Sequence, residues 1–163
     1  MTTPLNPKNA ELVVFQNHNL SLPLDSLPLM RIVSWGHRRG PLVPPPQVSI
    51  DLRRLPNPPK QVRTNQTGLS GAFRDSLFAL EAVQHRFERV CLIIRQALSE
   101  AGAAGVETII VGVNCELGKH RSVAFAEELG RIKWNGWKVV VSDVRARLGL
   151  KALFLARLER DLA

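Results

Sequence analysis

Hydrophobic and polar positions along the chain follow two periods, one typical of strands and one typical of helices. Residues 107–113 (ETIIVGV) form an almost unbroken apolar run rich in β-branched side chains, which predicts a buried strand. Residues 31–35 and 137–142 contain similar short runs, and residues 48–55 alternate apolar and polar positions before the turn-forming PNPP. These four segments are the strands that we expect in the sheet.

Segments with helical spacing separate these strands. Between residues 71 and 101 proline is absent and apolar residues recur every three or four positions, which predicts one long helix or two joined helices. Residues 120–134 predict another helix, and Leu155, Leu158 and Leu162 have helical spacing near the end of the chain. Because strands that alternate with helices form parallel sheets, the expected fold class is α/β: a mostly parallel β-sheet flanked by helices, in a single domain.

The first part of the chain has no sustained period. Residues 1–29 mix leucine, proline and asparagine, and we interpret them as a weakly structured N-terminal arm with one short strand at residues 12–15. Residues 40–47 contain three consecutive prolines, which lack NH donors and predict a rigid connection. The folded domain is therefore expected to cover residues 30–163.

The amino-acid composition indicates the net charge of the protein and the cellular compartment in which it is expected. Twenty-two Lys and Arg residues against fourteen Asp and Glu residues give a formal net charge of +8. This excess favours anionic partners such as phosphate groups or nucleic acid, and a basic surface that only keeps the protein soluble is the alternative. Two cysteines, Cys91 and Cys115, are too few for a disulfide framework, so we expect a cytoplasmic protein. No leader and no apolar run long enough for a membrane span is found in the sequence, so no membrane partner is expected.

The segment that follows the strand at residues 107–113 carries the candidate chemistry. Residues 114–122 (NCELGKHRS) would lie at the carboxyl end of a parallel strand and at the N-terminus of a helix, where free NH groups favour an anion. Gly118 permits a tight turn, and Arg121 offers a two-pronged contact with phosphate. The sequence therefore predicts an anion-binding strand-loop-helix. Its candidate phosphate-binding residues are Asn114, Gly118, Lys119, His120, Arg121 and Ser122.

Two phosphate-handling motifs fit this loop unequally. A Walker A loop has four residues between its first glycine and the Gly-Lys pair, whereas five follow Gly112 here, and His120 stands where Ser or Thr is required. The loop of cysteine-dependent phosphatases consists of Cys, five residues, Arg, and then Ser or Thr. Cys115, Arg121 and Ser122 match every one of these positions.

The phosphatase motif leaves three interpretations of Cys115 open. In a phosphatase its thiolate would attack phosphorus while Arg121 stabilised the transition state, and Asp51 would be the candidate general acid. The neighbours of Asp51 do not form the usual acid loop, and Asn114 stands where such phosphatases usually have histidine. A passive anion site and a buried, inert cysteine are the other interpretations. We favour binding without turnover.

Four segments, in the same order and at similar separations, resemble the C-terminal domain of the RNase adapter RapZ family. They are residues 34–41 (SWGHRRGP), 50–58 (IDLRRLPNP), 67–69 (TGL) and 115–129 (CELGKHRSVAFAEEL). The resemblance implies a domain that binds a phosphorylated amino sugar, glucosamine 6-phosphate. It also implies a homo-oligomer that engages regulatory RNA and an endoribonuclease. Residue by residue, it implies that Gly118, Lys119, His120, Arg121 and Ser122 hold the phosphate, and that Asp51, Arg53 and Thr67 line the rest of the pocket.

The chain departs from the family pattern at three places. Glu116 and Leu117 replace a Thr-Gly pair of the family. If the Glu116 carboxylate points outward, the anion site is preserved. If it points inward, it repels phosphate. The nucleotide-binding domain that precedes this domain in the family is not matched, so ATP or GTP binding is not implied. The His-Arg pair after the last strand is replaced by residues 142–144 (SDV), and RNA binding at that place is not implied.

A second group of cations surrounds the proline-rich segments. On one face these side chains would contact a nucleic-acid backbone, and a solvated charged surface is the alternative because no aromatic residues are interspersed among them. No spacing of histidine or cysteine predicts a metal site, and no cofactor is expected. The RNA-binding candidates are Arg38, Arg39, Arg54, Lys60 and Arg63.

Overall fold

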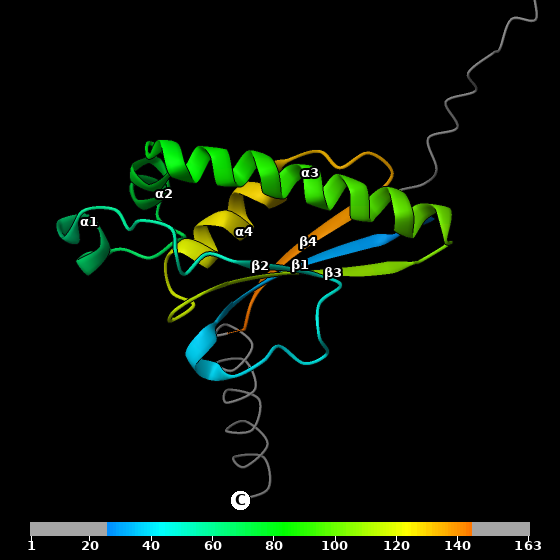
Figure 1. The fold of residues 1–163 in the computed structure, drawn as a ribbon, viewed down its shortest axis with the longest axis horizontal. Coiled ribbons are helices and arrows are strands. Elements are labelled where there is room, and N and C mark those ends of the chain that lie inside the picture. The colour runs from blue at the N-terminus through cyan, green and yellow to red at the C-terminus, as the bar shows by residue number, and fades with distance from the viewer. Residues whose placement is uncertain (1–25, 145–163) are drawn as a thin grey trace, which may run out of the picture.

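A four-stranded parallel sheet organises residues 26–144, the part of the chain that the computed structural model describes (Figure 1). The strand order is β2-β3-β1-β4, and each neighbouring pair is parallel. The predicted α/β class is therefore confirmed. The strands are β1 (Leu29–Gly36), β2 (Val48–Asp51), β3 (Thr108–Cys115) and β4 (Lys138–Asp143).

Helices α3 and α4 cover one face of this sheet, and α2 packs against both of them (Figure 1). The predicted helical region at residues 71–101 forms two helices, because Leu80 between them has an extended backbone with φ −81° and ψ 121°. The helices are η2 (His37–Arg39), which is a 3-10 turn, α1 (Lys60–Asn65), α2 (Gly71–Phe78), α3 (Glu81–Ala103) and α4 (Arg121–Arg131).

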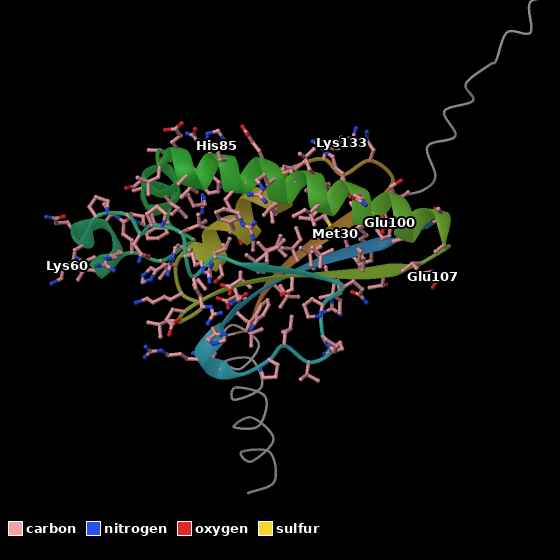
Figure 2. All side chains as sticks on the ribbon, viewed as in Figure 1. Met30, Lys60, His85, Glu100, Glu107 and Lys133 are labelled. Carbon is pink, nitrogen blue, oxygen red and sulfur yellow. The ribbon has the colours of Figure 1, made fainter. Side chains whose placement is uncertain are left out.

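The hydrophobic core lies between the sheet and these helices. Side chains alternate along each strand, so Met30 and Ile32 of β1 and Val111 and Val113 of β3 all face the helices and are fully buried. Figure 2 shows Met30 between the sheet and α3. Burial of one such side chain stabilises the fold by about 1.5–3 kcal/mol. The helices contribute, among others, Phe73, Leu77, Val83, Ile94, Phe125 and Leu129.

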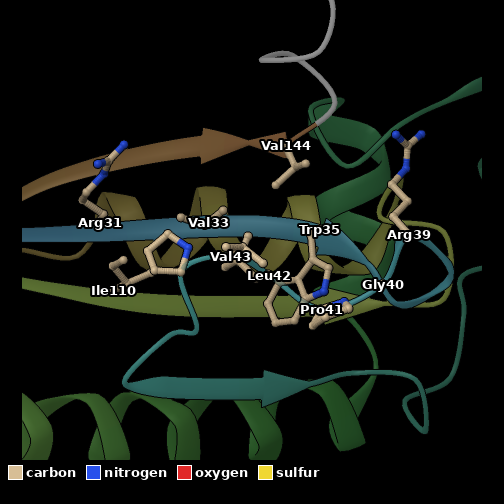
Figure 3. A pocket seen from close by; sticks show the side chains of 11 residues that line it. Arg31, Val33, Trp35, Arg39, Gly40, Pro41, Leu42, Val43, Ile110 and Val144 are labelled. Carbon is tan, nitrogen blue, oxygen red and sulfur yellow. The ribbon is translucent and has the colours of Figure 1, made fainter.

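The opposite face of the sheet is covered by the connection between β1 and β2. A Cβ atom on Gly112 would lie 2.7 Å from the Trp35 ring and 2.8 Å from Pro46, so the proline-rich connection packs directly on the sheet at this point. A hollow of about 330 Å³ remains beside it, and Val33, Trp35, Leu42 and Val43 are among its lining residues (Figure 3).

Three local predictions differ from the structure. The strand predicted at residues 48–55 ends at Asp51, and the helix predicted at residues 120–134 ends at Arg131. The Trp134 indole donates a hydrogen bond to the carbonyl oxygen of Leu129 (2.9 Å), which satisfies a carbonyl in the last turn of α4 while the chain leaves the helix. Helix α1 was not predicted, because it has no buried residue and hence no apolar period.

Some predictions concern residues outside the described range. The short strand at residues 12–15 and the stripe of Leu155, Leu158 and Leu162 lie there, and the boundary between arm and domain stays a prediction. Within residues 26–144, no helix combines the length and the apolar character that crossing a bilayer requires.

Candidate functional site

The loop between β3 and α4 lies at the carboxyl ends of the strands, as the sequence predicts. Gly118 has a φ of +68°, and a Cβ atom there would lie 2.4 Å from the backbone nitrogen of Gly36. A Cβ atom on Gly36 would lie 2.6 Å from the carbonyl group of Leu117. The end of β1 and the loop therefore meet backbone against backbone, which two glycines permit.

A third glycine joins the segment before α2 to the same loop. The backbone NH of Gly68 donates a hydrogen bond to the carbonyl oxygen of Lys119 (3.1 Å). A Cβ atom on Gly68 would lie 2.3 Å from the carbonyl oxygen of His120 and 2.5 Å from the nitrogen of Ala124. The segments at residues 34–41 and 67–69 that carry the family resemblance thus fix the loop from two sides.

Cys115 lies at the base of this loop with a ring of donors around its sulfur. Its side chain is 3% exposed, and its Sγ is 3.2 Å from the Oγ of Ser122. Burial raises the pKa of the Cys115 thiol, but the Ser122 hydroxyl and the backbone NH groups of Ser122, Gly118 and His120 together bring it below the ordinary value. We call these three backbone groups the NH cradle. They provide an environment that stabilises negative charge.

Arg121 connects the loop to the segment after β2. It is 7% exposed, and its Nη1 donates hydrogen bonds to the carbonyl oxygens of Leu52 (3.1 Å), Arg53 (3.0 Å) and Leu55. Another segment of the resemblance, residues 50–58, is thereby held against the segment at residues 115–129. The Arg121 side chain thus has a structural role as well as a position beside Cys115.

His120 makes a similar connection on the other side. Its ring stacks on Phe73 with centroids 5.3 Å apart, and its Nε2 is 3.0 Å from the carbonyl oxygen of Gln66. A carbonyl oxygen can only accept, so Nε2 carries the proton in this contact. The imidazole therefore positions the segment before α2, and the backbone NH of the same residue belongs to the NH cradle.

A hollow of about 280 Å³ opens above Cys115, and we call it the Cys115 hollow. It brings together four predicted site residues: Cys115, His120 and Arg121 of the loop, and Arg63 of the RNA-binding candidates. Asn57 and Leu117 were not predicted, although Asn57 belongs to the LPNP segment of the resemblance and that signal pointed to it. Its lining residues are Asn57, Arg63, Cys115, Glu116, Leu117, His120 and Arg121.

Asp51 and Arg53 form a separate charged pair outside the lining of this hollow. Two hydrogen-bonded contacts of 2.8 Å and 3.0 Å join the Arg53 guanidinium to Oδ2 of Asp51. The Arg53 side chain lowers the pKa of Asp51, so this carboxyl group is ionised at neutral pH. Asn114 donates a long hydrogen bond of 3.4 Å to the same carboxylate. In the sheet register Asn114 pairs with Asp51, so both lie on the face opposite to Cys115.

The remaining predicted residues contribute backbone or turn contacts. The Oγ1 of Thr67 accepts a hydrogen bond from the NH of Leu69 (3.3 Å), which stabilises the local turn. Gly118 and Ser122 supply NH groups to the cradle, and the carbonyl oxygen of Lys119 accepts from Gly68. The side chains of Thr67 and Lys119 are not among the groups that line the Cys115 hollow.

Glu116 is hydrogen-bonded to Arg38 in η2, the turn that follows β1. The Nε of Arg38 donates a hydrogen bond of 2.7 Å to its carboxylate, and the backbone NH of Arg38 donates to its carbonyl oxygen (3.2 Å). The Arg38 side chain lowers the pKa of Glu116, which is therefore ionised and electrically balanced. Arg38 thus neutralises the Glu116 carboxylate, while Glu116 also lines the Cys115 hollow.

The candidate RNA-binding cations lie on several elements. Arg38 pairs with Glu116, whereas Arg39 lines the hollow on the opposite face of the sheet (Figure 3). Lys60 and Arg63 belong to α1, and Figure 2 shows Lys60 at the end of the domain opposite to Glu107. Arg39 and Arg63 therefore line two different hollows. RNA binding by the whole group stays a prediction.

Together, the parallel sheet and the NH cradle at the start of α4 define an α/β domain whose strand-loop-helix gathers backbone NH groups around Cys115. The sequence model of the family described as RapZ C-terminal domain matches residues 28–146, and the chain belongs to this family. That membership supports a binding or regulatory role.

Curated relatives of this chain carry the name nucleotide-binding protein. The protein from Finegoldia magna is 30% identical over 73% of this chain and 42% of its own length. The protein from Rubrobacter xylanophilus is 36% identical over 61% of this chain and 33% of its own length. The protein from Fervidobacterium nodosum is 30% identical over 91% of this chain and 52% of its own length. The chain thus spans about half or less of the length of these relatives.

Proposed function

We propose that the chain is a regulatory or adapter domain that binds a phosphorylated small metabolite in the Cys115 hollow. The phosphate would occupy the NH cradle, and the remainder of the ligand would extend toward the opening. Glucosamine 6-phosphate is the ligand that the family resemblance suggests. A volume of about 280 Å³ is at the small end of ligand sites, which suits a sugar phosphate. RNA or an RNA-processing enzyme would be the macromolecular partner.

The observation that carries this proposal is the convergence of donors at the start of α4. The NH groups of Gly118, His120 and Ser122 all favour the anionic form of Cys115, so the same place favours a phosphate oxygen. The positive end of the α4 dipole acts in the same direction. Arg121, beside these groups, adds a full positive charge.

Phosphate-dependent stabilisation tests the proposal. Glucosamine 6-phosphate at one hundred times its Kd is expected to raise the free energy of unfolding by about 2.7 kcal/mol, and glucosamine without the phosphate is expected to have no effect. Thermal unfolding with increasing concentrations of each compound, and of inorganic phosphate, measures this difference. Equal stabilisation by the sugar and by its phosphate ester would contradict a phosphate site.

The lowered pKa of the Cys115 thiol favours one second candidate, a cysteine-dependent phosphatase. The thiolate would form an S–P bond while the P–O bond to the substrate alcohol breaks and the alcohol oxygen takes a proton. Water would then cleave the S–P bond and release inorganic phosphate. The acid for the first step is the weak point, because Asp51 is ionised and does not line the hollow.

An assay of p-nitrophenyl phosphate separates the two candidates. For a binding domain we expect no release of p-nitrophenol above the buffer rate. Phosphatase activity that Cys115→Ser abolishes and Cys91→Ser retains would replace the binding proposal. Cys91 is a suitable control because it is also buried, and burial raises the pKa of its thiol above the ordinary value.

A further inference from the structure

The two faces of the sheet are covered unequally. Helices α3 and α4 pack on one face, and Figure 1 shows no α-helix of residues 26–144 over the other. The proline-rich connection approaches that second face over β3, where a Cβ atom on Gly112 would lie 2.8 Å from Pro46. Parallel sheets are normally covered on both faces, because their strands are apolar on both sides. The part of the second face that β1 and β4 form therefore lacks a covering helix among residues 26–144.

The hollow of about 330 Å³ on this face is largely apolar, and we call it the sheet-face hollow. Val43 in its lining is 82% exposed. Val140 of β4 is 41% exposed and pairs in register with Arg31, which lines the hollow, so both side chains point to the same face. An exposed apolar patch of this kind marks a contact surface. The apolar lining residues are Val33, Trp35, Pro41, Leu42, Val43, Pro44, Ile110 and Val144 (Figure 3).

The described part of the chain ends at this hollow. Val144 is the last described residue and is among the lining residues (Figure 3). Residues 145–163 follow it directly and contain six leucines and one phenylalanine. The spacing of Leu155, Leu158 and Leu162 predicts a helix, and a helix of this length would extend about 28 Å. Strand β4 has 6 residues and spans about 20 Å, so the segment is long enough to run back over β4 and β1.

We propose that residues 145–163 fold back onto the sheet-face hollow and cover it with their leucines and Phe154. The attachment at Val144 favours this segment over a second copy of the chain, because a directly linked group has a local concentration on the order of millimolar. The contact is apolar rather than ionic, since the segment has five cations and two carboxylates and the hollow itself contributes Arg31 and Arg39. This inference does not depend on the ligand of the Cys115 hollow.

The covered surface would also border the candidate site through η2. Arg39 of this turn lines the sheet-face hollow, and its neighbour Arg38 pairs with Glu116, which lines the Cys115 hollow. A segment seated in the sheet-face hollow therefore packs against the turn that holds one wall of the candidate site.

Cysteine cross-linking in the full chain tests the inference. Val43→Cys is combined with one further cysteine, placed in turn at each of positions 150–156, because consecutive positions of a helix sample every direction around its axis. A disulfide forms only where the two Cα atoms lie within about 7 Å. After mild oxidation, we expect most molecules of at least one double variant to contain a disulfide within one chain. Mass spectrometry of the peptides identifies it and distinguishes the buried native Cys91 and Cys115.

Leu92→Cys in place of Val43→Cys is the matched control. Leu92 is also exposed, at 63%, but it belongs to α3, which packs on the other face of the sheet. We expect no disulfide within one chain from this position. Equal cross-linking from both positions would overturn the inference, because the segment would then have no preferred place. Disulfides between two chains alone would assign the hollow to a second copy, and the absence of any disulfide from Val43→Cys would also overturn the inference.

Unfolding of Val43→Ser gives a second readout that needs no introduced disulfide. Replacement of an exposed valine leaves stability nearly unchanged, whereas replacement of a covered valine removes apolar contact. We therefore expect Val43→Ser to lower the urea midpoint of the full chain. The effect should disappear in a chain that also carries Leu153→Ser, Phe154→Ser and Leu155→Ser. An unchanged midpoint for Val43→Ser alone would mean that no part of the chain covers Val43, which would overturn the inference.

Discussion

Alanine at Gly118 is expected to lower the free energy of unfolding by about 2–5 kcal/mol. A left-handed backbone costs about 1–2 kcal/mol with a side chain present, and Gly118 has a φ of +68°. The new Cβ atom would also lie 2.4 Å from the nitrogen of Gly36 and 2.6 Å from the carbonyl carbon of Trp35. Such overpacking adds about 1–3 kcal/mol, because backbone atoms on both sides must move. Urea unfolding followed by tryptophan fluorescence measures the difference.

Gly136 provides a matched control for the two contributions. It has a φ of +79°, and a Cβ atom there would meet nothing within 4 Å. Gly136→Ala is therefore expected to show only the backbone cost of about 1–2 kcal/mol. If the two alanine variants unfolded at the same urea concentration, the close contact between β1 and the loop would contribute nothing.

The sheet and its covering helices could be predicted because their buried apolar side chains recur at regular spacing in the sequence. Residues 107–113 have an apolar run since β3 is covered on both faces, by helices and by the proline-rich connection. Helix α1 has no buried side chain, so no period signals it. The end of α4 depends on the contact between Trp134 and Leu129, which no local rule of spacing contains.

The sequence predicted the position of the candidate loop, but not which side chains line the hollow beside it. The spacing of Cys115, Arg121 and Ser122 indicated an anion site, and these residues lie together. Asp51 was included among the predicted site residues because it lies at the end of a neighbouring strand. Successive side chains of a strand point to opposite faces of the sheet, so this position alone does not place Asp51 beside Cys115. In register Asp51 pairs with Asn114, one residue before Cys115, so its carboxylate lies on the other face. The pairing of strands far apart in sequence decides this, and single-sequence patterns do not supply it.

Alanine at Arg121 is expected to remove both stability and phosphate binding. Its Nη1 donates to carbonyl oxygens of Leu52, Arg53 and Leu55, and hydrogen bonds from a charged donor contribute about 1.5–3 kcal/mol each, with incomplete additivity. We expect the free energy of unfolding to fall by about 2–4 kcal/mol, since the carbonyl groups would lose their donor in a largely buried place. Loss of the Leu55 contact would also release one side of the α1 segment.

Arg131→Ala separates the loss of this buried guanidinium from the loss of any arginine on α4. Arg131 pairs with Glu128 at 2.9 Å, but its side chain is 58% exposed, and such surface pairs contribute about 0–1 kcal/mol. We expect this variant to melt close to the unmodified chain and to retain stabilisation by inorganic phosphate. Arg121→Ala is compared at a temperature well below its own melting point, so that loss of binding is not confused with unfolding. Phosphate stabilisation that survived in Arg121→Ala would assign Arg121 a structural role alone, with the backbone NH groups sufficient for the anion.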